Sequence, residues 1–150
     1  MGCDIHTIAQ RRSADGKWEN IEDLNPFDWQ SYGMFGFLAG VRNYSALRPI
    51  SEPRGLPDDF VDLDGGPFVG DHSFSWLSVE ELTAFDYDAE MEDRRTRVQV
   101  APNFWNGGAT AEPGSGEMTT YREFLGEEFF RDLAALKAGG AERIVFGFDS

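Results

Sequence analysis

Residues 143–149 read Arg-Ile-Val-Phe-Gly-Phe-Asp, and this closing run is the clearest indication of the fold. Its middle, Ile144–Phe148, is almost continuously apolar, which is typical of a strand that is covered on both faces. We therefore expect these residues to form a central strand of a sheet.

A long helix is predicted just before that strand. Thr120 and Glu123 have the spacing of a capping box, and Gly139-Gly140 provides a stop. Between them the apolar residues recur at helical spacing, at Tyr121, Phe124, Leu125, Phe129, Leu133 and Leu136. We expect one continuous helix over this span.

The N-terminus predicts a β-hairpin. Residues Cys3–Gln10 alternate around Ile5 and Ile8, which is the period of a strand with one buried face. The turn dipeptide Asp15-Gly16 follows, and Lys17–Ile21 supplies the second strand.

Three shorter elements are predicted between these ends. Apolar residues recur at helical spacing from 29 to 39, and Gly40 can end that helix. Ser78 and Glu81 have capping-box spacing and open a second helix, which runs through Leu82 and Phe85. Residues 96–100 alternate as a strand.

Irregular chain is expected in two places. Residues 41–71 have little periodicity and many Pro and Gly residues, which is typical of a binding loop or lid. Asn106–Gly116 is rich in glycine and is expected to form a loop, while the stretch Asp86–Asp93 is rich in acidic residues. Together these patterns predict an α+β fold, with residues 1–150 as a single domain that has a small mixed sheet, flanking helices and one long irregular loop.

Composition narrows the classes of function. The chain has 150 residues, is 41% hydrophobic and carries a formal net charge of −14, so it is expected to fold and to repel phosphate backbones and anionic lipid. Direct nucleic-acid binding and membrane binding are therefore disfavoured. The single cysteine, Cys3, cannot form an internal disulfide, which favours a reducing cytoplasm. No apolar run is long enough to span a membrane, and no secretion signal is recognisable.

Four residues could bind a divalent metal such as zinc, manganese or iron: Asp4, His6, His72 and Asp149. Asp4 and His6 are two positions apart on a predicted strand and therefore share a face. The structural alternative is a half-buried histidine beside a solvated acid. Cys3 could be a nucleophile, but a lone cysteine in a strand is more often a small apolar residue.

A second set of residues suits an anionic or nucleotide-like ligand. Arg42 and Asn43 follow a predicted helix end, and Arg54 lies in the proline-bounded turn Pro53–Pro57. A guanidinium is a planar donor suited to phosphate or carboxylate, although in so acidic a chain it is also the natural partner of a local acid. Trp76 could stack on a ring. The predicted ligand site comprises Asp4, His6, Arg42, Asn43, Arg54, His72 and Trp76.

Several of these residues belong to motifs that resemble a family of uncharacterised proteins found mainly in tailed bacteriophages and prophages. The motifs are the opening Met-Gly-Cys-Asp-Ile-His, Leu38–Asn43, Ile50–Pro57, the box His72–Leu77 and the closing Arg143–Asp149. The resemblance implies a phage accessory protein that acts in the cytoplasm of the bacterial host cell. Members of this family tend to carry a further histidine where this chain has Phe74, which weakens the metal site here.

Three functions are therefore open. The first is a binding protein whose pocket holds a small anionic or nucleotide-like molecule and, in the phage setting, sequesters a host-defence signal. The second is a metal-dependent hydrolase that uses the Asp and His residues. The third is an acidic interaction protein, such as a DNA mimic that occupies a host protein. A homo-oligomer is compatible with each of them.

Overall fold

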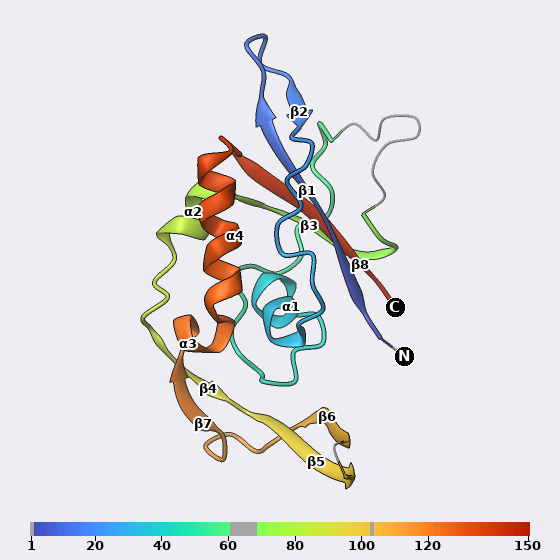
Figure 1. Ribbon diagram of the computed structural model, residues 1–150, viewed down its shortest axis with the longest axis vertical. Coiled ribbons are helices and arrows are strands. Elements are labelled where there is room, and N and C mark those ends of the chain that lie inside the picture. The colour runs from blue at the N-terminus through green and yellow to red at the C-terminus, as the bar shows by residue number, and fades with distance from the viewer. Residues whose placement is uncertain (1, 61–68, 103) are drawn as a thin grey trace. The chain divides into compact units, whose positions relative to one another are not determined.

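The structure is a computed structural model that describes residues 2–60, 69–102 and 104–150, with the backbone alone at 97–100 and 104–108. The chain divides into two compact units. Figure 1 shows the elements of the chain, coloured from the N-terminus to the C-terminus. We call the two units the sheet unit (Met1–Gln30, Pro53–Phe85 and Glu127–Ser150) and the ribbon unit (Ser31–Glu52 and Asp86–Gly126). Each unit is assembled from segments that are separated in the sequence, so no single linker marks the boundary between the units.

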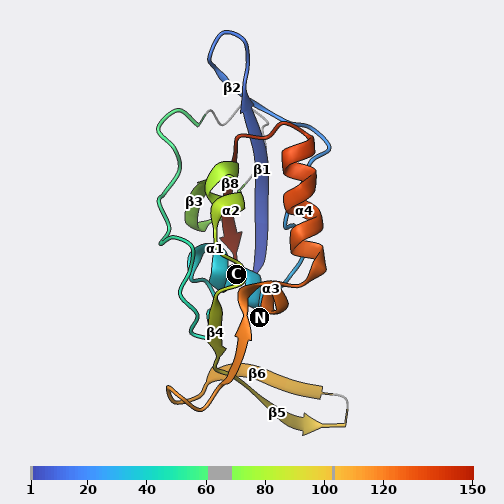
Figure 2. The same cartoon turned by 90° about the vertical axis from the view of Figure 1, so that its left-hand side faces the viewer.

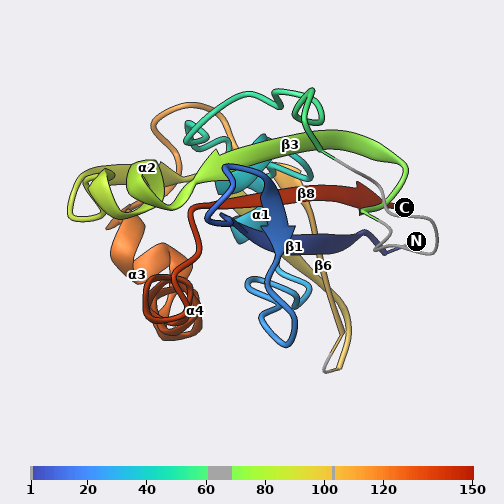
Figure 3. The same ribbon diagram turned by 90° about the horizontal axis from the view of Figure 1, so that it is seen from above.

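A four-stranded antiparallel sheet forms the centre of the sheet unit. Its order is β2 (Trp18–Asn20), β1 (Asp4–Arg12), β8 (Arg143–Asp149) and β3 (His72–Ser78). Figure 3 shows β1, β8 and β3 lying side by side in that order. The predicted N-terminal hairpin and the predicted interior position of the closing strand are both confirmed.

Both faces of the sheet contain buried residues, and one of them includes a buried cation. Cross-strand partners share a face, and Phe148 pairs with Ile5 while Ile144 pairs with Ala9. These four residues are buried, which makes their face apolar. On the opposite face, Arg143 is the cross-strand partner of Gln10, and both are buried polar residues. Ile8 and Val145 pair on this same face and are buried, so the polar pair lies at the end of β8 next to apolar residues.

Two helices complete the sheet unit. The expected capping box between Ser78 and Glu81 is present and opens α2 (Val79–Ala84). In α4 (Glu127–Ala138), Phe129 is fully buried and stacks on Phe27, with the ring centroids 4.7 Å apart. Asp132 accepts a hydrogen bond of 2.7 Å from the backbone N–H of Phe27.

The predicted long helix is wrong in one respect, because two helices occupy its span. The α3 helix (Tyr121–Leu125) begins at the predicted cap, Thr120, and ends at Gly126, which has φ of 83°. Few residues other than glycine adopt such an angle, so the helix stops there although the apolar spacing continues. The second helix, α4, starts at the next residue, Glu127.

The ribbon unit combines α1 and α3 with two antiparallel ribbons. The α1 helix (Tyr32–Ala39) has Ser31 as its N-cap and Gly40, at φ of 72°, as its C-cap, which confirms the predicted helix and its stop. Phe37 is fully buried, and its ring centroid lies 5.8 Å from that of Tyr87 and 5.7 Å from that of Tyr121.

The ribbons correct one prediction of irregular chain. The predicted strand near 96–100 is confirmed as β5 (Arg95–Ala101), but its partner β6 (Phe104–Thr110) occupies the start of the predicted glycine-rich loop. Figure 2 shows β5 and β6, in gold, running side by side. The acid-rich stretch contains β4 (Glu90–Asp93), which pairs with β7 (Glu117–Thr120). Backbone pairing with a neighbouring strand outweighs the weak strand preference of glycine and acidic residues.

The α+β fold class is confirmed, and every described strand pair is antiparallel. Residues 41–60 and 69–71 form no helix or strand, as predicted for the long irregular loop, whereas 61–68 lie outside the described residues. Within the part of the chain that the structure describes, no helix has the length and apolar character needed to cross a bilayer.

Candidate functional site

An open pocket of about 460 Å³ lies in the sheet unit, next to β3 and β8. We call it the Arg54–Trp76 pocket. Its described lining residues are Arg54, Leu56, Pro57, Asp58, Asp59, Trp76 and Arg143. The structure thus brings together two of the predicted ligand residues, Arg54 and Trp76, which are separated by 22 positions in the sequence.

The turn that carries Arg54 is held by β3. The backbone N–H of Arg54 donates to the Ser75 hydroxyl at 3.0 Å, and that of Gly55 donates to the Phe74 carbonyl at 2.8 Å. Because β3 is the last strand of the sheet, its outer backbone groups have no neighbouring strand, and the Gly55 N–H satisfies one of them, the Phe74 carbonyl. Trp76 itself lies inside β3.

The Arg54 guanidinium is the partner of a local acid. Its two terminal nitrogens lie 2.9 and 2.5 Å from the two carboxylate oxygens of Glu81, and its carbon lies 4.7 Å from the centroid of the Trp76 ring. Burial raises the pKa of Glu81, but hydrogen bonds from Arg54 and Ser78 outweigh it and hold the pKa below its ordinary value. Arg54 therefore positions the Trp76 ring, and its positive charge is matched by Glu81.

Arg143 is a site residue that the sequence reading missed. It is only 5% exposed, its Nε donates to the Gln10 side chain at 2.8 Å, and its Nη1 donates to Asp59 at 3.0 Å. The guanidinium carbon lies 3.7 Å from the centroid of the Trp18 ring. Among the described residues, no atom accepts a hydrogen bond from its buried Nη2. The sequence feature that could have identified it is a positively charged residue at the first position of a predicted strand whose other residues are almost all apolar.

Asp59 is the exposed member of the Arg143 pair. Its side chain is 58% exposed, whereas that of Arg143 is 6% exposed. Desolvation raises the pKa of Asp59, but the hydrogen bond and positive charge of Arg143 outweigh it and lower the pKa from its ordinary value. The buried cation is thus balanced by a carboxylate that remains in contact with solvent.

The predicted metal ligands do not form one set. His6 Nε2 lies 2.5 Å from Asp149 Oδ2, and Asp4 is the cross-strand partner of Asp149, so these three share a sheet face. His72 instead pairs with Phe148, on whose ring it stacks, and Phe148 faces the other way from Asp149. Within the described residues, no group of three or more His, Cys, Asp or Glu side chains is placed to hold a metal ion.

None of these histidines and acids is among the described residues that line the Arg54–Trp76 pocket. The ring nitrogens of His72 each lie 3.0 Å from a hydroxyl, those of Ser73 and Ser150. Cys3 is fully buried, as expected for a small apolar residue.

Arg42 and Asn43 belong to the ribbon unit and have local roles there. The Asn43 side chain donates to the Leu47 carbonyl at 2.8 Å and accepts from the Leu47 N–H at 3.2 Å, which closes a turn. Arg42 lies over the Tyr32 ring at 5.5 Å and has φ of 51°. These contacts explain both residues as parts of the chain reversal after α1.

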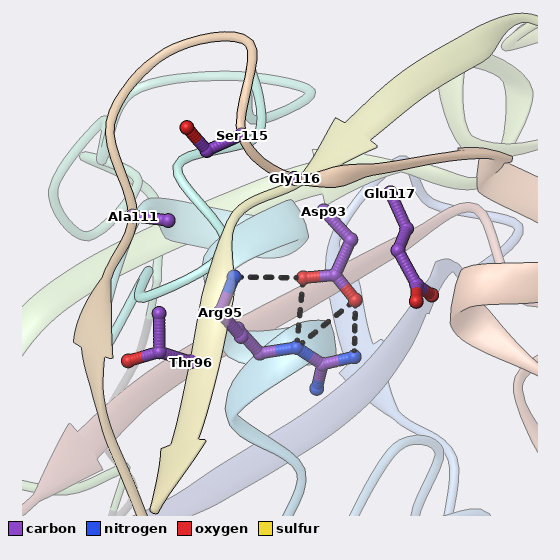
Figure 4. A pocket seen from close by; sticks show the side chains of 7 residues that line it. All are labelled: Asp93, Arg95, Thr96, Ala111, Ser115, Gly116 and Glu117. Carbon is purple, nitrogen blue, oxygen red and sulfur yellow. Dashed lines mark hydrogen bonds and ion pairs between the residues drawn. The ribbon is translucent and has the colours of Figure 1, made fainter.

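A second pocket, of about 440 Å³, lies in the ribbon unit (Figure 4). Figure 4 shows the Arg95 guanidinium directed at the Asp93 carboxylate, with distances of 2.8 to 3.3 Å. Glu117 is the cross-strand partner of Asp93. Among the described lining residues Arg95 is the one cation, and it is matched within the pocket, so we assign this pocket no ligand.

Comparisons of the chain with protein-family models, with curated proteins and with solved structures found no match. The functional argument therefore depends on the chemistry of the Arg54–Trp76 pocket.

Proposed function

We propose that this protein binds a small molecule in the Arg54–Trp76 pocket, with an acceptor atom of the ligand meeting the Arg143 guanidinium. The observation that carries the proposal is the buried Nη2 of Arg143, which has no hydrogen-bond acceptor among the described residues. A buried donor without an acceptor costs about 1–3 kcal/mol, and more when it is charged. A ligand oxygen would remove that cost.

Access to the guanidinium is supported by the unequal exposure of its ion pair. Because the Asp59 side chain is 58% exposed and sits outside any helix or strand, its carboxylate can turn into solvent at little cost. A ligand carboxylate or phosphate could then take its place, with one oxygen accepting from Nη1 and a second accepting from Nη2. Asp59 would act as an internal stand-in for that part of the ligand.

The rest of the pocket suits a flat apolar group. Trp76 has Arg54 near its ring, and Leu56 is an exposed large apolar side chain, 41% exposed, beside Pro57. An aromatic ring lying against these side chains would bury apolar surface and stack on the indole. The volume of about 460 Å³ falls in the range of small-molecule sites.

This proposal keeps the predicted binding function but changes the site. Arg54 and Trp76 stay, and Arg143 replaces the other predicted ligand residues as the anion receptor. The further idea that a phage protein uses such a pocket to sequester a host-defence signal rests on the sequence resemblance alone.

The test is native mass spectrometry of untagged protein, followed by calorimetric titration of any molecule that copurifies. We expect a discrete small-molecule adduct, bound at least about fivefold more weakly by Trp76→Ala, since stacking on an aromatic side chain contributes about 1–3 kcal/mol per ring. Arg131→Gln, an exposed arginine of α4, is the matched control and should bind as the unmodified protein does.

Arg143→Gln tests the acceptor contact, and circular dichroism establishes whether that variant folds. The proposal is wrong if the protein carries no adduct and binds no member of a panel of carboxylates, phosphates and nucleosides. It is also wrong if Trp76→Ala and Arg131→Gln bind the ligand equally well.

A further inference from the structure

The place beside Arg143 in the Arg54–Trp76 pocket already holds a carboxylate. Asp59 Oδ1 accepts from Nη1 of Arg143 at 3.0 Å, and the Trp18 side chain also donates to the Asp59 carboxylate. The Trp18 ring lies against the guanidinium, whose carbon is 3.7 Å from the ring centroid. The donors at this place therefore suit a carboxylate group.

Asp59 makes incomplete use of the guanidinium. It reaches Nη1, while the buried Nη2 has no acceptor among the described residues. Arginine binds a carboxylate best when the two oxygens accept from two nitrogens in parallel. A ligand carboxylate is not tethered to the backbone, so it can take both nitrogens and satisfy the donor that Asp59 leaves unpaired.

The charges of the pocket favour a ligand with one negative charge. Among the described lining residues the cations are Arg54 and Arg143, and Arg54 is held by both carboxylate oxygens of Glu81. Exchange of one carboxylate for another leaves the charge beside Arg143 unchanged. A phosphate monoester carries about −1.5 to −2 at pH 7, so it would add negative charge near the displaced Asp59, in a chain of net charge −14.

Trp76 and Arg143 are placed to hold two ends of one small molecule. Trp76 is the partner of Val145 in the pairing of β3 with β8. Arg143 is two positions from Val145 on β8, so its side chain and that of Trp76 share a face of the sheet. Diagonal neighbours of this kind are about 7–8 Å apart. A ligand that stacks on the indole and reaches Arg143 therefore needs its carboxylate within a few bonds of its ring.

We infer that the Arg54–Trp76 pocket takes an aromatic monocarboxylate, and that Asp59 competes with this ligand for Arg143. The inference rests on the binding function proposed above and names its ligand class. The ligand carboxylate accepts from Nη1 and Nη2 of Arg143, and the ring stacks on Trp76. Because Asp59 has to leave Arg143 first, it lowers the affinity of the pocket for its ligand.

The experiment is calorimetric titration of the full chain with phenylacetate and three analogues. Phenylacetamide keeps the shape without the charge, cyclohexylacetate keeps the charge without the aromatic ring, and benzyl phosphate replaces the carboxylate by a phosphate. We expect phenylacetamide to bind at least about tenfold more weakly, because it cannot accept two charged hydrogen bonds. Cyclohexylacetate should bind at least about twofold more weakly, and benzyl phosphate no more tightly than phenylacetate.

The variant Asp59→Asn tests the competition. It should bind phenylacetate about fivefold more tightly, because the ligand no longer has to break an ion pair that is partly exposed. Asp28→Asn removes the same charge from an exposed position of the sheet unit outside the described pocket lining, and it should leave the affinity unchanged. Circular dichroism checks the fold of both variants, and the analogue series needs neither of them.

The outcomes separate this inference from the binding function itself. Equal binding of phenylacetate and phenylacetamide, tighter binding of benzyl phosphate, or equal affinities of folded Asp59→Asn and Asp28→Asn would overturn it. If the protein binds another molecule in a Trp76-dependent manner and no phenylacetate, the ligand class is wrong and the binding function stands. If nothing binds, both fail.

Discussion

Replacing Glu81 by glutamine tests how the turn at Arg54 is held. Glutamine is nearly the same size and is accepted at this position of a capping box, so its side-chain oxygen can still accept from the Ser78 N–H, a bond of 2.8 Å in the structure. The substitution removes the negative charge that two nitrogens of Arg54 contact at 2.9 and 2.5 Å. It therefore weakens the ion pair and preserves the cap.

The size of the effect follows from the burial of this pair. The two side chains are 30% and 29% exposed, which places the pair between a surface ion pair, at about 0–1 kcal/mol, and a charged hydrogen bond, at about 1.5–3 kcal/mol. We expect Glu81→Gln to lower the free energy of unfolding by about 1–2 kcal/mol. Glu81→Ala also removes the capping bonds and should cost about 1 kcal/mol more.

The assay is urea unfolding at pH 7, followed by far-ultraviolet circular dichroism. Glu80→Gln is the matched control, because Glu80 lies in the same first turn of α2 and is exposed. It loses only its interaction with the helix dipole, about 0.3–1 kcal/mol. If the two variants are equally stable, the argument for the Arg54–Glu81 pair is refuted.

The stabilising effect of Glu81 should also depend on pH. The pKa of Glu81 lies below its ordinary value of 4.5 in the folded protein, so its stabilisation is fully present above pH 4.5 and is lost as the pH falls through the folded pKa. The difference in stability between the unmodified protein and Glu81→Gln should therefore shrink in acid. A difference that grows in acid would contradict the assignment.

Two further substitutions test the packing of the sheet unit. A Cβ atom at Gly147 would overlap the Val69 carbonyl oxygen, so Gly147→Ala should lower the free energy of unfolding by about 3 kcal/mol or more, measured by urea unfolding. The control is Gly55→Ala: its Cβ would meet no atom within 4 Å, but φ at this position is 81°, so it should cost only about 1 kcal/mol. Equal losses for the two variants would refute the close approach at Gly147. Asp132→Asn weakens the 2.7 Å hydrogen bond from the Phe27 N–H and should lower the free energy of unfolding by about 1–2 kcal/mol. The Phe27 amide should then exchange its hydrogen faster, and slower exchange would contradict this prediction.

Local patterns in the sequence were enough to predict several elements. The apolar run at 144–148 identified the interior strand, and the spacing of Ser78 and Glu81 identified a helix start. Signals of this kind succeed because burial and capping are satisfied within one element and its immediate neighbours. The break at Gly126 was missed because the apolar spacing continues across it, and spacing does not show backbone angle.

The candidate site depended on contacts that no local pattern encodes. Arg143 donates to Gln10, 133 positions away, and to Asp59, 84 positions away, so its charge is explained only once β1 and β8 are paired. The same pairing separates His72 from His6, although each has a nearby aspartate in the sequence. Residue type and spacing along the chain were sufficient to predict which segments are buried and where helices begin. Which polar groups meet could be read only from the folded chain, because strand register sets the face of each side chain and brings distant charges within hydrogen-bond reach.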